Sequence, residues 1–224
     1  QIRLSASSDL YKIQQVENTI NALQKIAAAH RAEFQIPILG ITGSNGKTIV
    51  KEWLTQMILT KLCVCASPDS YNSQIGVPLS VWQLNDYHQL GLFEAGISQP
   101  HEMESLQKII KPNYGIFTNI GQAHSENFGT LEEKTIEKTK LFRETEVLIY
   151  CRDHELIHKV VKENLKSKTK LITWGENPES TIRIIQKTRN GKTTSLTLVN
   201  NQQKIQLELP VSDMASIENA MHCY

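Results

Sequence analysis

Residues 36–48 place a glycine-rich turn directly between a strand and a helix. The apolar run IPILGIT is typical of a buried strand, and it leads through GSNGK into a helical stretch that runs from Thr48 to about Lys61. Glycines at positions 43 and 46 let the backbone turn tightly, so that its N–H groups can point at phosphate oxygens. This order of elements predicts a phosphate-binding P-loop, in which Lys47 reaches the β- and γ-phosphates of a nucleotide and the Thr48 hydroxyl binds Mg²⁺.

One position departs from the strict P-loop pattern, GxxxxGK followed by Ser or Thr. That pattern would have its first glycine at position 41, where this sequence has isoleucine. A turn that contains Gly-Lys-Thr by chance is therefore the alternative. Because the strand, the loop and the helix are all in register, the phosphate-binding interpretation is favoured.

Strands and helices alternate at least five times over the first 175 residues. Apolar runs such as CVCA, LGLFEAG, YGIFTNI and EVLIYC are separated by helical stretches that include VPLSVWQL, HEMESLQKIIK and DHELIHKVVKENLK, the last with Asp153 as its expected N-cap. Residues 11–31 also have helical spacing. After about Pro178 three β-like runs follow one another, with an Asn190-Gly191 hairpin turn between the first two. We therefore predict an α/β fold: a mostly parallel P-loop sheet flanked by helices, with a small antiparallel β extension at 178–210.

Composition excludes several classes of partner. The net charge is +1 and no apolar stretch approaches the length of a membrane span, so neither nucleic acid nor a membrane is an expected partner. The first residues lack the apolar core of a signal peptide, and we expect a cytoplasmic protein. The four cysteines show no CxxC spacing, and Cys63 and Cys65 are expected to be reduced core thiols.

Two further polar residues follow predicted strands directly. Glu94 ends the run LGLFE, and His124 comes shortly after YGIFTNI. Ligands of open parallel sheets bind at the carboxyl ends of the strands, so Glu94 is a candidate Mg²⁺ ligand and His124 a candidate site residue. Lys138 stands in the charged helical stretch LEEKTIEKTKLF, where its chemistry alone indicates a surface lysine.

These segments resemble the Mur ligase family. Residues 42–48, TGSNGKT, are similar to the family P-loop TGxNGKT, which accounts for the isoleucine at position 41. The resemblance covers roughly residue 36 to the C-terminus, and it implies that ATP is bound by Gly43, Ser44, Asn45, Gly46, Lys47 and Thr48. Glu94, in Phe-Glu-Ala-Gly, matches a magnesium-binding glutamate, and His124, in a segment similar to Thr-Asn-x-Gly-x-Ala-His, matches a histidine near a second metal ion.

The segment YNSQIGVPL at 71–79 resembles the Asn-Asn-x-Ile-Gly-Val-Pro signature of one branch of the family. That branch joins D-alanyl-D-alanine to UDP-MurNAc-tripeptide, so the resemblance implies that Asn72, Ser73 and Gln74 contact substrate, with Ser73 in place of the second asparagine. The sequences of this segment and of FEAGISQPHEME most resemble those of the family members that are fused to an alanine racemase. The selection between lysine and diaminopimelate in the tripeptide is left open.

Two more correspondences concern the nucleotide site. The family has a lysine, modified to a carbamate, about 14 residues after its histidine, and Lys138 matches it; the neighbouring charges, Lys134 and Glu137 among them, are then expected on the solvated face of the helix. Asn219 matches the second asparagine of the HNxxNA segment near adenine, although Ala215 and Ser216 replace the His-Asn pair.

The resemblance implies an ATP-dependent ligase that works through an acyl phosphate. Lys47, His124 and Lys138 are then the catalytic residues, and Thr48, Glu94, His124 and Lys138 hold Mg²⁺. Residues 1–34 are expected to form a connector helix from an N-terminal domain, and residues 35–224 the central ATP-binding domain, with a C-terminal domain completing the enzyme. We expect the first and third of these domains to lie outside this chain.

Two alternatives remain beside this interpretation. A folylpolyglutamate synthetase-like ligase shares the P-loop, but SYNSQIGVPLS argues against it. A nucleotide-binding module without chemistry of its own is the second. A P-loop GTPase is disfavoured, because the sequence has no NKxD motif.

Overall fold

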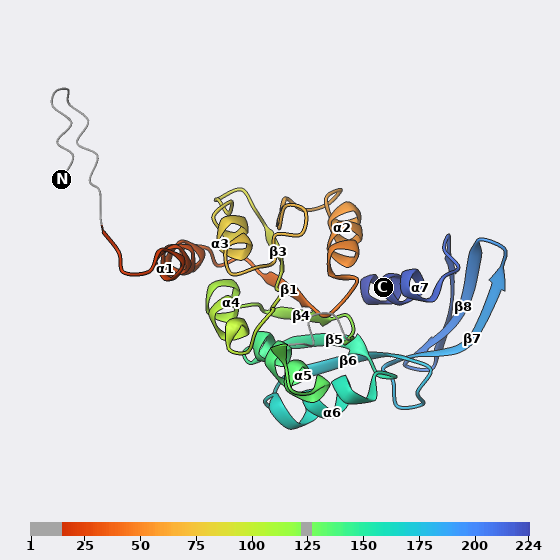
Figure 1. The fold of residues 1–224 in the computed structure, drawn as a ribbon. Helices are drawn as coiled ribbons and strands as arrows, with labels where there is room; N and C mark the ends of the chain where they lie inside the picture. Colours follow the sequence, from red (N-terminus) through yellow and green to blue (C-terminus); the bar gives the residue numbers. More distant parts are fainter. Residues whose placement is uncertain (1–14, 122–126) are drawn as a thin grey trace.

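Strand β1 (Ile38–Thr42) is buried along its whole length in the computed structural model, which describes residues 15–121 and 127–224 (Figure 1). Its side chains alternate between two sides. Ile38 packs into one hydrophobic cluster, whereas Leu39 and Ile41 pack into another on the opposite side. A strand that is apolar on both faces belongs in the interior of a sheet covered on both sides.

One sheet contains the nine strands of the described residues, in the order β2-β3-β1-β4-β5-β6-β7-β8-β9. The parallel part comprises β2 (Val64–Ala66), β3 (Leu90–Glu94), β1, β4 (Tyr114–Phe117), β5 (Val147–Cys151) and β6 (Lys170–Gly175). Strand β7 (Ile182–Asn190) pairs in parallel with β6, and then β8 (Thr193–Asn200) and β9 (Gln203–Leu209) continue antiparallel. The predicted fold class is confirmed, and the antiparallel extension is part of the same sheet.

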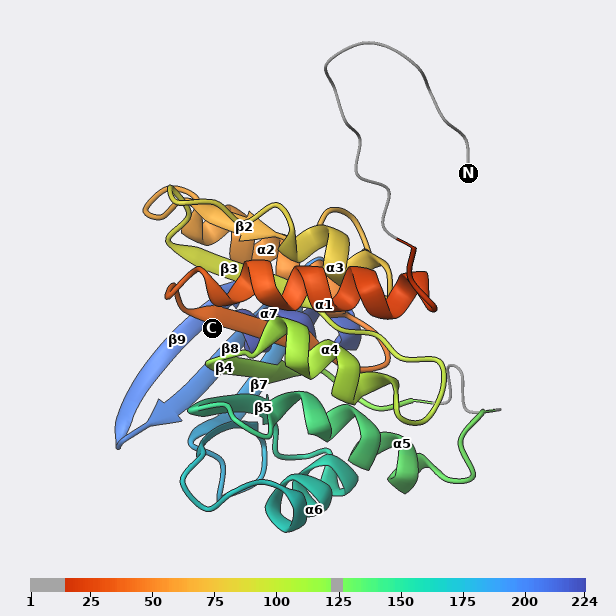
Figure 2. The same cartoon turned by 90° about the vertical axis from the view of Figure 1, so that its left-hand side faces the viewer.

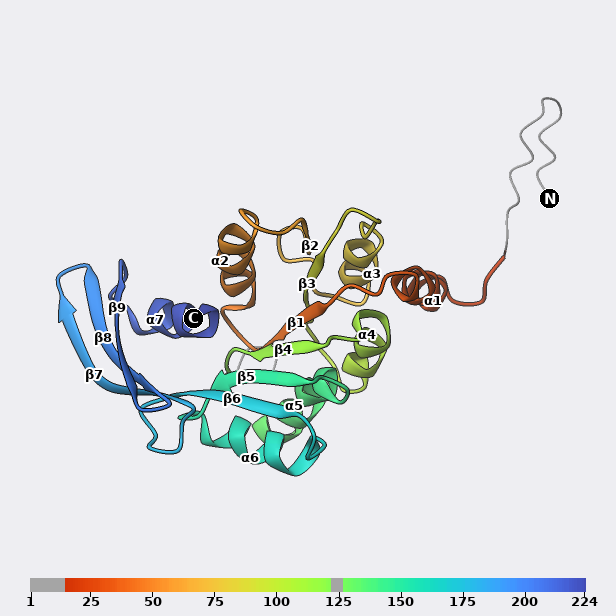
Figure 3. The same ribbon diagram turned by 180° about the vertical axis from the view of Figure 1, so that it is seen from behind.

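Helices cover both faces of the parallel strands. In Figure 3 helices α2 (Lys47–Ile58) and α7 (Met214–Cys223) lie side by side on one face, and α4 (Glu102–Ile110), α5 (Leu131–Thr139) and α6 (Glu155–Asn164) lie on the other. The last turn after α5 is a 3₁₀ helix, η2 (Lys140–Phe142). Helix α7 therefore brings the end of the chain back beside the helix that follows the P-loop.

Helix α1 (Thr19–Ala32) lies across α3 (Gly76–Val81) and α4, as Figure 2 shows. It begins later than predicted, because the Asn18 side chain accepts a hydrogen bond from Asn21 N and so caps the helix at that point. Gln24 on α1 donates to the Gln74 side chain at 2.9 Å. The predicted connector helix thus contacts the candidate substrate segment, while the domain boundaries themselves stay a prediction.

The predicted cap of α6 was wrong. His154 occupies the N-cap position, and the Asp153 carboxylate instead accepts hydrogen bonds from the backbone N–H groups of Glu176 and Asn177, at 2.7 and 2.9 Å. Asp153 therefore joins the loop after β5 to the loop after β6. The predicted hairpin turn is confirmed: β7 ends at Asn190, and Gly191 adopts a φ of +62°.

Candidate functional site

The loop between β1 and α2 has a backbone conformation that favours glycine at two positions. Gly43 and Gly46 have φ angles of +149° and +81°. A Cβ at Gly43 would lie 1.9 Å from Thr118 Oγ1, and one at Gly46 would lie 2.2 Å from Asn219 Oδ1. The loop is therefore held between the end of β4 and helix α7, and the sequence expectation of a tight glycine turn is confirmed.

Asn119 anchors the middle of this loop. The N–H of Ser44 donates to the Asn119 carbonyl at 2.8 Å, and the N–H of Asn45 donates to its side-chain oxygen at 3.0 Å. In this structure these two N–H groups thus point at Asn119. The first turn of α2 has no side-chain cap, so its N–H groups face the end of the helix where an anion is favoured.

Two lysine ammonium groups converge on the carbonyl of Gly43. Lys47 Nζ donates to it at 3.0 Å and Lys138 Nζ at 3.1 Å. Burial lowers the pKa of Lys47, although Glu94 partly opposes this shift. Burial, and then the charges of Lys47 and Lys134, lower the pKa of Lys138 to about 7. Closely spaced cations of this kind favour a multiply charged anion beside them.

More of the charged side chains of helix α5 are buried than its composition indicated. Lys138 is only 3% exposed, so the interpretation from its chemistry alone as a surface lysine was wrong. Lys134 and Glu137, expected on the solvated face, are also buried. Lys134 Nζ donates to the Gly121 carbonyl at 2.7 Å, and Glu137 accepts from Met103 N at 3.1 Å and pairs with Lys140. Polar partners thus compensate the burial of these charges.

Glu94, at the end of β3, is fully buried beside the P-loop. Its Oε2 accepts hydrogen bonds from Thr48 Oγ1 at 3.1 Å and from Asn72 Nδ2 at 3.3 Å. Within the described residues its Oε1 makes no hydrogen bond, and it lies 3.5 Å from Lys51 Nζ, which is an ion pair without hydrogen-bond geometry. A carboxylate and a hydroxyl that adjoin in this way are hard oxygen donors, and they fit a magnesium ion.

A cavity of about 460 Å³ joins the P-loop to the candidate substrate segment. Its lining includes Gly43, Lys47, Lys138, Glu102 and the segment 72–75. Ser73 Oγ accepts the N–H of Gly76, the first residue of α3, at 3.1 Å, whereas Gln74 Nε2 donates to the Glu102 carbonyl at 3.2 Å. The structure thus brings together the residues predicted for nucleotide and for substrate.

Helix α7 closes the far side of the P-loop. Asn219 is 5% exposed and lies against Gly46. His222 was not predicted as a site residue. Its Nδ1 accepts a hydrogen bond from Trp174 Nε1 (3.2 Å), so its Nε2 carries the proton and donates to the Thr118 carbonyl (3.0 Å). Burial lowers the pKa of His222 to about 4, which keeps the ring neutral. His124 lies outside the described residues.

The cysteines match their prediction in part. All four are free, and Cys65 is buried, as expected of a core thiol. Burial raises the pKa of Cys65 to about 11 and that of Cys151 to about 12, so these thiols stay protonated at neutral pH. Cys63 is exposed, and its prediction as a core residue was wrong because the strand begins one residue later, at Val64.

None of the helices in residues 15–121 and 127–224 combines the length and the apolar character that crossing a membrane requires. This finding concerns the described helices alone.

Comparisons with known proteins agree with this geometry. The chain is 39% identical over 128 residues to the UDP-N-acetylmuramoyl-tripeptide–D-alanyl-D-alanine ligase of Treponema pallidum, which covers 57% of this chain and 28% of that protein. It is 31% identical over 209 residues to the ligase of the same name from Buchnera aphidicola subsp. Baizongia pistaciae, covering 92% of this chain and 45% of that protein. The chain thus spans less than half the length of these two relatives.

Among solved structures, the MurF ligase from Thermotoga maritima in complex with ADP has a similar fold. The TM-score is 0.82 at 23% identity, over 99% of this chain and 51% of that one. Residues 41–224 match the family model described as the Mur ligase middle domain. This match begins within β1 and includes the P-loop, Glu94, Lys138 and α7. The chain therefore belongs to the Mur ligase middle-domain family.

Proposed function

We propose that this chain is the ATP-binding part of a ligase that joins D-alanyl-D-alanine to UDP-MurNAc-tripeptide. The observation that carries the proposal is the cavity of about 460 Å³ in which Lys47 and Lys138 face the segment 72–75. A cationic phosphate site thereby opens directly onto the segment expected to bind substrate. Two of its relatives carry the name of this ligase, and for that reason the folylpolyglutamate synthetase-like alternative is not favoured.

ATP is the nucleotide in this proposal. The P-loop, the first turn of α2 and Lys47 would surround its phosphates, and Asn219 would contact the adenosine part from α7. The supporting observations are the uncapped start of α2 and the contact between Asn219 and Gly46. The residues assigned to the nucleotide are Gly43, Ser44, Asn45, Gly46, Lys47, Thr48 and Asn219.

Magnesium fits the oxygen atoms that the structure brings together. Thr48 and Glu94 would hold one ion, and His124 with the carbamate of Lys138 would serve a second. When bound, magnesium neutralises negative charge on the phosphate oxygens. The buried Glu94 Oε1 accepts no hydrogen bond from residues 15–121 or 127–224, so the carboxylate keeps acceptor capacity for a cation.

The reaction proposed has two stages. A carboxylate oxygen of the tripeptide attacks the γ-phosphorus of ATP, and the bond between that phosphorus and the β–γ bridging oxygen breaks. ADP departs as the leaving group, and the tripeptide carries an acyl phosphate. The amine of D-alanyl-D-alanine then attacks the acyl carbon, phosphate departs, and the amine nitrogen loses a proton. Lys47 would stabilise charge on the transferring oxygens, while the segment 72–75 would orient the acceptor.

Lys138 has the chemistry that carbamate formation requires. Only a neutral amine attacks CO₂, and a pKa of about 7 leaves roughly half of this amine neutral at pH 7. Carbamate formation would replace the positively charged ammonium of Lys138 with an anionic oxygen ligand.

The remaining assignments concern the whole enzyme. Residues 1–34 would connect to an N-terminal domain and residues 35–224 would form the central domain, with a C-terminal domain closing over ATP. Residues 178–210 form the β extension of that domain. We place the enzyme in the cytoplasm, with no nucleic-acid or membrane partner, and a fused alanine racemase would follow it.

The test is phosphate release by the full-length protein that carries this chain. We expect release only when ATP, Mg²⁺, UDP-MurNAc-tripeptide and D-alanyl-D-alanine are all present, together with a ligated product seen by mass spectrometry. Nucleotide binding without release under these conditions would favour the non-catalytic module instead.

A further inference from the structure

Lys51 is a buried lysine that the proposed mechanism does not use. It lies on α2 one turn after Lys47, and its side chain is 1% exposed. Lys47 bends back to the P-loop, whereas Lys51 points across to the segment between β2 and α3. A buried ammonium is costly unless acceptors surround it, so its partners define what this residue does.

The partners of Lys51 belong to the segment after β2, to α2 itself and to the end of β3. Its Nζ donates to the backbone carbonyls of Ser67 at 2.7 Å and Asp69 at 2.5 Å. It also lies 2.8 Å from Glu52 Oε1 and 3.5 Å from Glu94 Oε1. Asp69 has a φ of +42°, a turn that lets two carbonyls of one short segment face the same cation.

The segment that Lys51 binds leads directly to Asn72. Ser67 Oγ accepts the N–H of Glu94 at 3.2 Å, and the Asn72 carbonyl accepts the N–H of Gly96 at 2.7 Å. The Asn72 side chain then reaches Glu94 Oε2. Residues 67–72 are thus attached to the end of β3 at both ends, and the only buried cation bonded to their carbonyls in the described chain is Lys51.

We propose that Lys51 is a positioning residue, which fastens segment 67–72 to helix α2 and so sets Asn72 beside Glu94 and the P-loop. The inference rests on the proposed function, because it concerns how the acceptor segment is held against the nucleotide site. Without the ammonium, the buried carbonyl of Ser67 and the partly buried carbonyl of Asp69 lose their donor, and the segment has to move toward water.

Lys51→Met tests this role, because methionine keeps much of the volume and removes the donors. We expect the KM for UDP-MurNAc-tripeptide to rise about tenfold or more in the full-length enzyme, while the KM for ATP changes by less than about twofold. A merely structural residue would lower kcat through loss of folded enzyme and would leave both KM values unchanged. An unchanged tripeptide KM in a folded variant therefore overturns the proposal.

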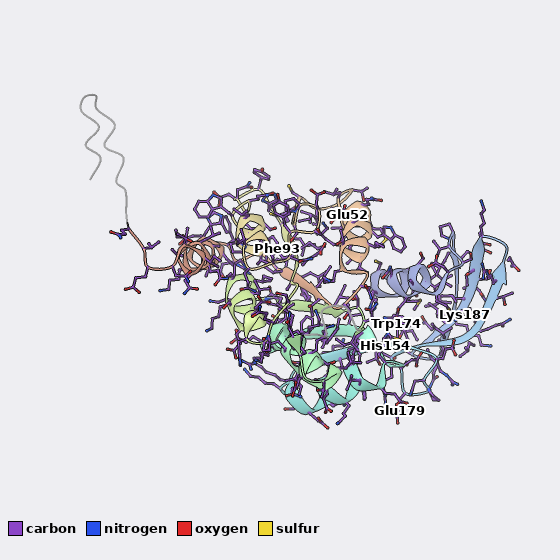
Figure 4. All side chains as sticks on the ribbon, viewed as in Figure 1. Glu52, Phe93, His154, Trp174, Glu179 and Lys187 are labelled. Atoms are coloured by element: carbon purple, nitrogen blue, oxygen red, sulfur yellow. The ribbon has the colours of Figure 1, made fainter. Side chains whose placement is uncertain are left out.

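Glu52→Gln is the matched control. It removes the other carboxylate on Lys51, which belongs to a half-exposed side chain on α2 (Figure 4), and leaves the carbonyl contacts intact. We expect wild-type KM values from it. An equal rise of the tripeptide KM in Glu52→Gln would show that general charge on α2, and not the hold on segment 67–72, is responsible.

Amide hydrogen exchange on the chain itself gives a readout independent of activity. Lys51→Met should speed exchange in residues 67–77 and at Gly96 about tenfold, with β5 and β6 unchanged. Should Lys51→Met fail to fold, Lys51→Arg decides, because it keeps the charge but cannot place one nitrogen between two carbonyls. Unaltered exchange there overturns the proposal. A wild-type enzyme that does not ligate would refute the proposed function, and the exchange data would still decide the role of Lys51.

Discussion

The side-chain ammonium of Lys138 donates a hydrogen bond of 3.1 Å to the carbonyl of Gly43, 95 residues earlier in the chain. Helix α5 therefore contacts the P-loop at Gly43, the first residue after β1. Because Lys138 is buried and its pKa is lowered to about 7, this contact has a measurable dependence on pH.

Lys138→Met should stabilise the domain at neutral pH. The wild-type lysine binds a proton in the unfolded chain up to about pH 10.5 but loses it in the folded chain above about pH 7, so folding releases a proton in this window. Wild-type stability therefore rises between pH 7 and 10, and the advantage of the variant should shrink over that range. Thermal unfolding of both proteins at pH 7, 8.5 and 10 measures this difference; a constant difference would contradict the lowered pKa.

Lys138→Ala should remove ligation in the full-length enzyme, because the anionic oxygen of the carbamate is lost. Added bicarbonate should not restore this variant, since it has no amine, whereas a short carboxylate such as acetate or formate should restore part of the rate. Initial rates with and without the carboxylate provide the measurement. A rate equal to that of the wild type would show that Lys138 has no catalytic role.

Lys47→Ala should lower the rate of ligation at least about a hundredfold while the domain stays folded. Lys47 contributes charge to the loop, and its side chain donates to the loop carbonyls of Gly43 and Ser44. Titration with a fluorescent ATP analogue, together with circular dichroism, separates loss of binding from loss of structure. Near-normal kcat would contradict the P-loop assignment.

Gly46→Ala should weaken nucleotide binding about tenfold or more. The φ of +81° costs alanine about 1 kcal/mol or more, and the added methyl group would lie 2.2 Å from Asn219 Oδ1. The double variant Gly46→Ala/Asn219→Ala removes the collision but keeps the backbone strain and also loses the proposed contact of Asn219 with adenosine, so it should recover only part of the affinity. Full recovery would show that the collision alone matters.

His222→Gln should remove a dependence of stability on acid. The pKa of His222 is lowered from 6.5 to about 4, so its contribution is complete above pH 6.5 and is lost as the pH falls toward 4. The wild type should lose up to about 3 kcal/mol more than the variant over this window. Urea unfolding at pH 7, 5.5 and 4.5 tests this, and parallel curves would contradict it.

The order of strands and helices could be predicted because it depends on local patterns. Apolar runs on both faces of β1 and the positions of Gly43 and Gly46 are properties of short segments, and the structure confirms them. The ends of elements were less predictable, because contacts outside the segment decide them. Asp153 has the chemistry of an N-cap but is recruited by the loop after β6.

Burial of charged side chains could not be predicted from composition. Lys51, Lys134 and Lys138 stand in helical stretches, and each is buried against carbonyl acceptors in loops outside its own helix, 16, 13 and 95 residues away in the sequence. A periodicity of apolar residues carries no signal for such pairing. Lys51 could have been suspected only from its spacing of four residues from Lys47.

Because α7 packs against the P-loop, the order in which the chain is synthesised affects when the phosphate site is complete. The ribosome supplies Gly46 and Thr118 long before it supplies Asn219 and His222, the residues that pack against them. A nascent chain made only as far as Leu209 contains every strand of the described sheet but not α7, so one wall of its phosphate loop is missing. The full support of the phosphate loop is therefore present only once α7 has been made, and a product that ends before α7 would carry the motif without that support.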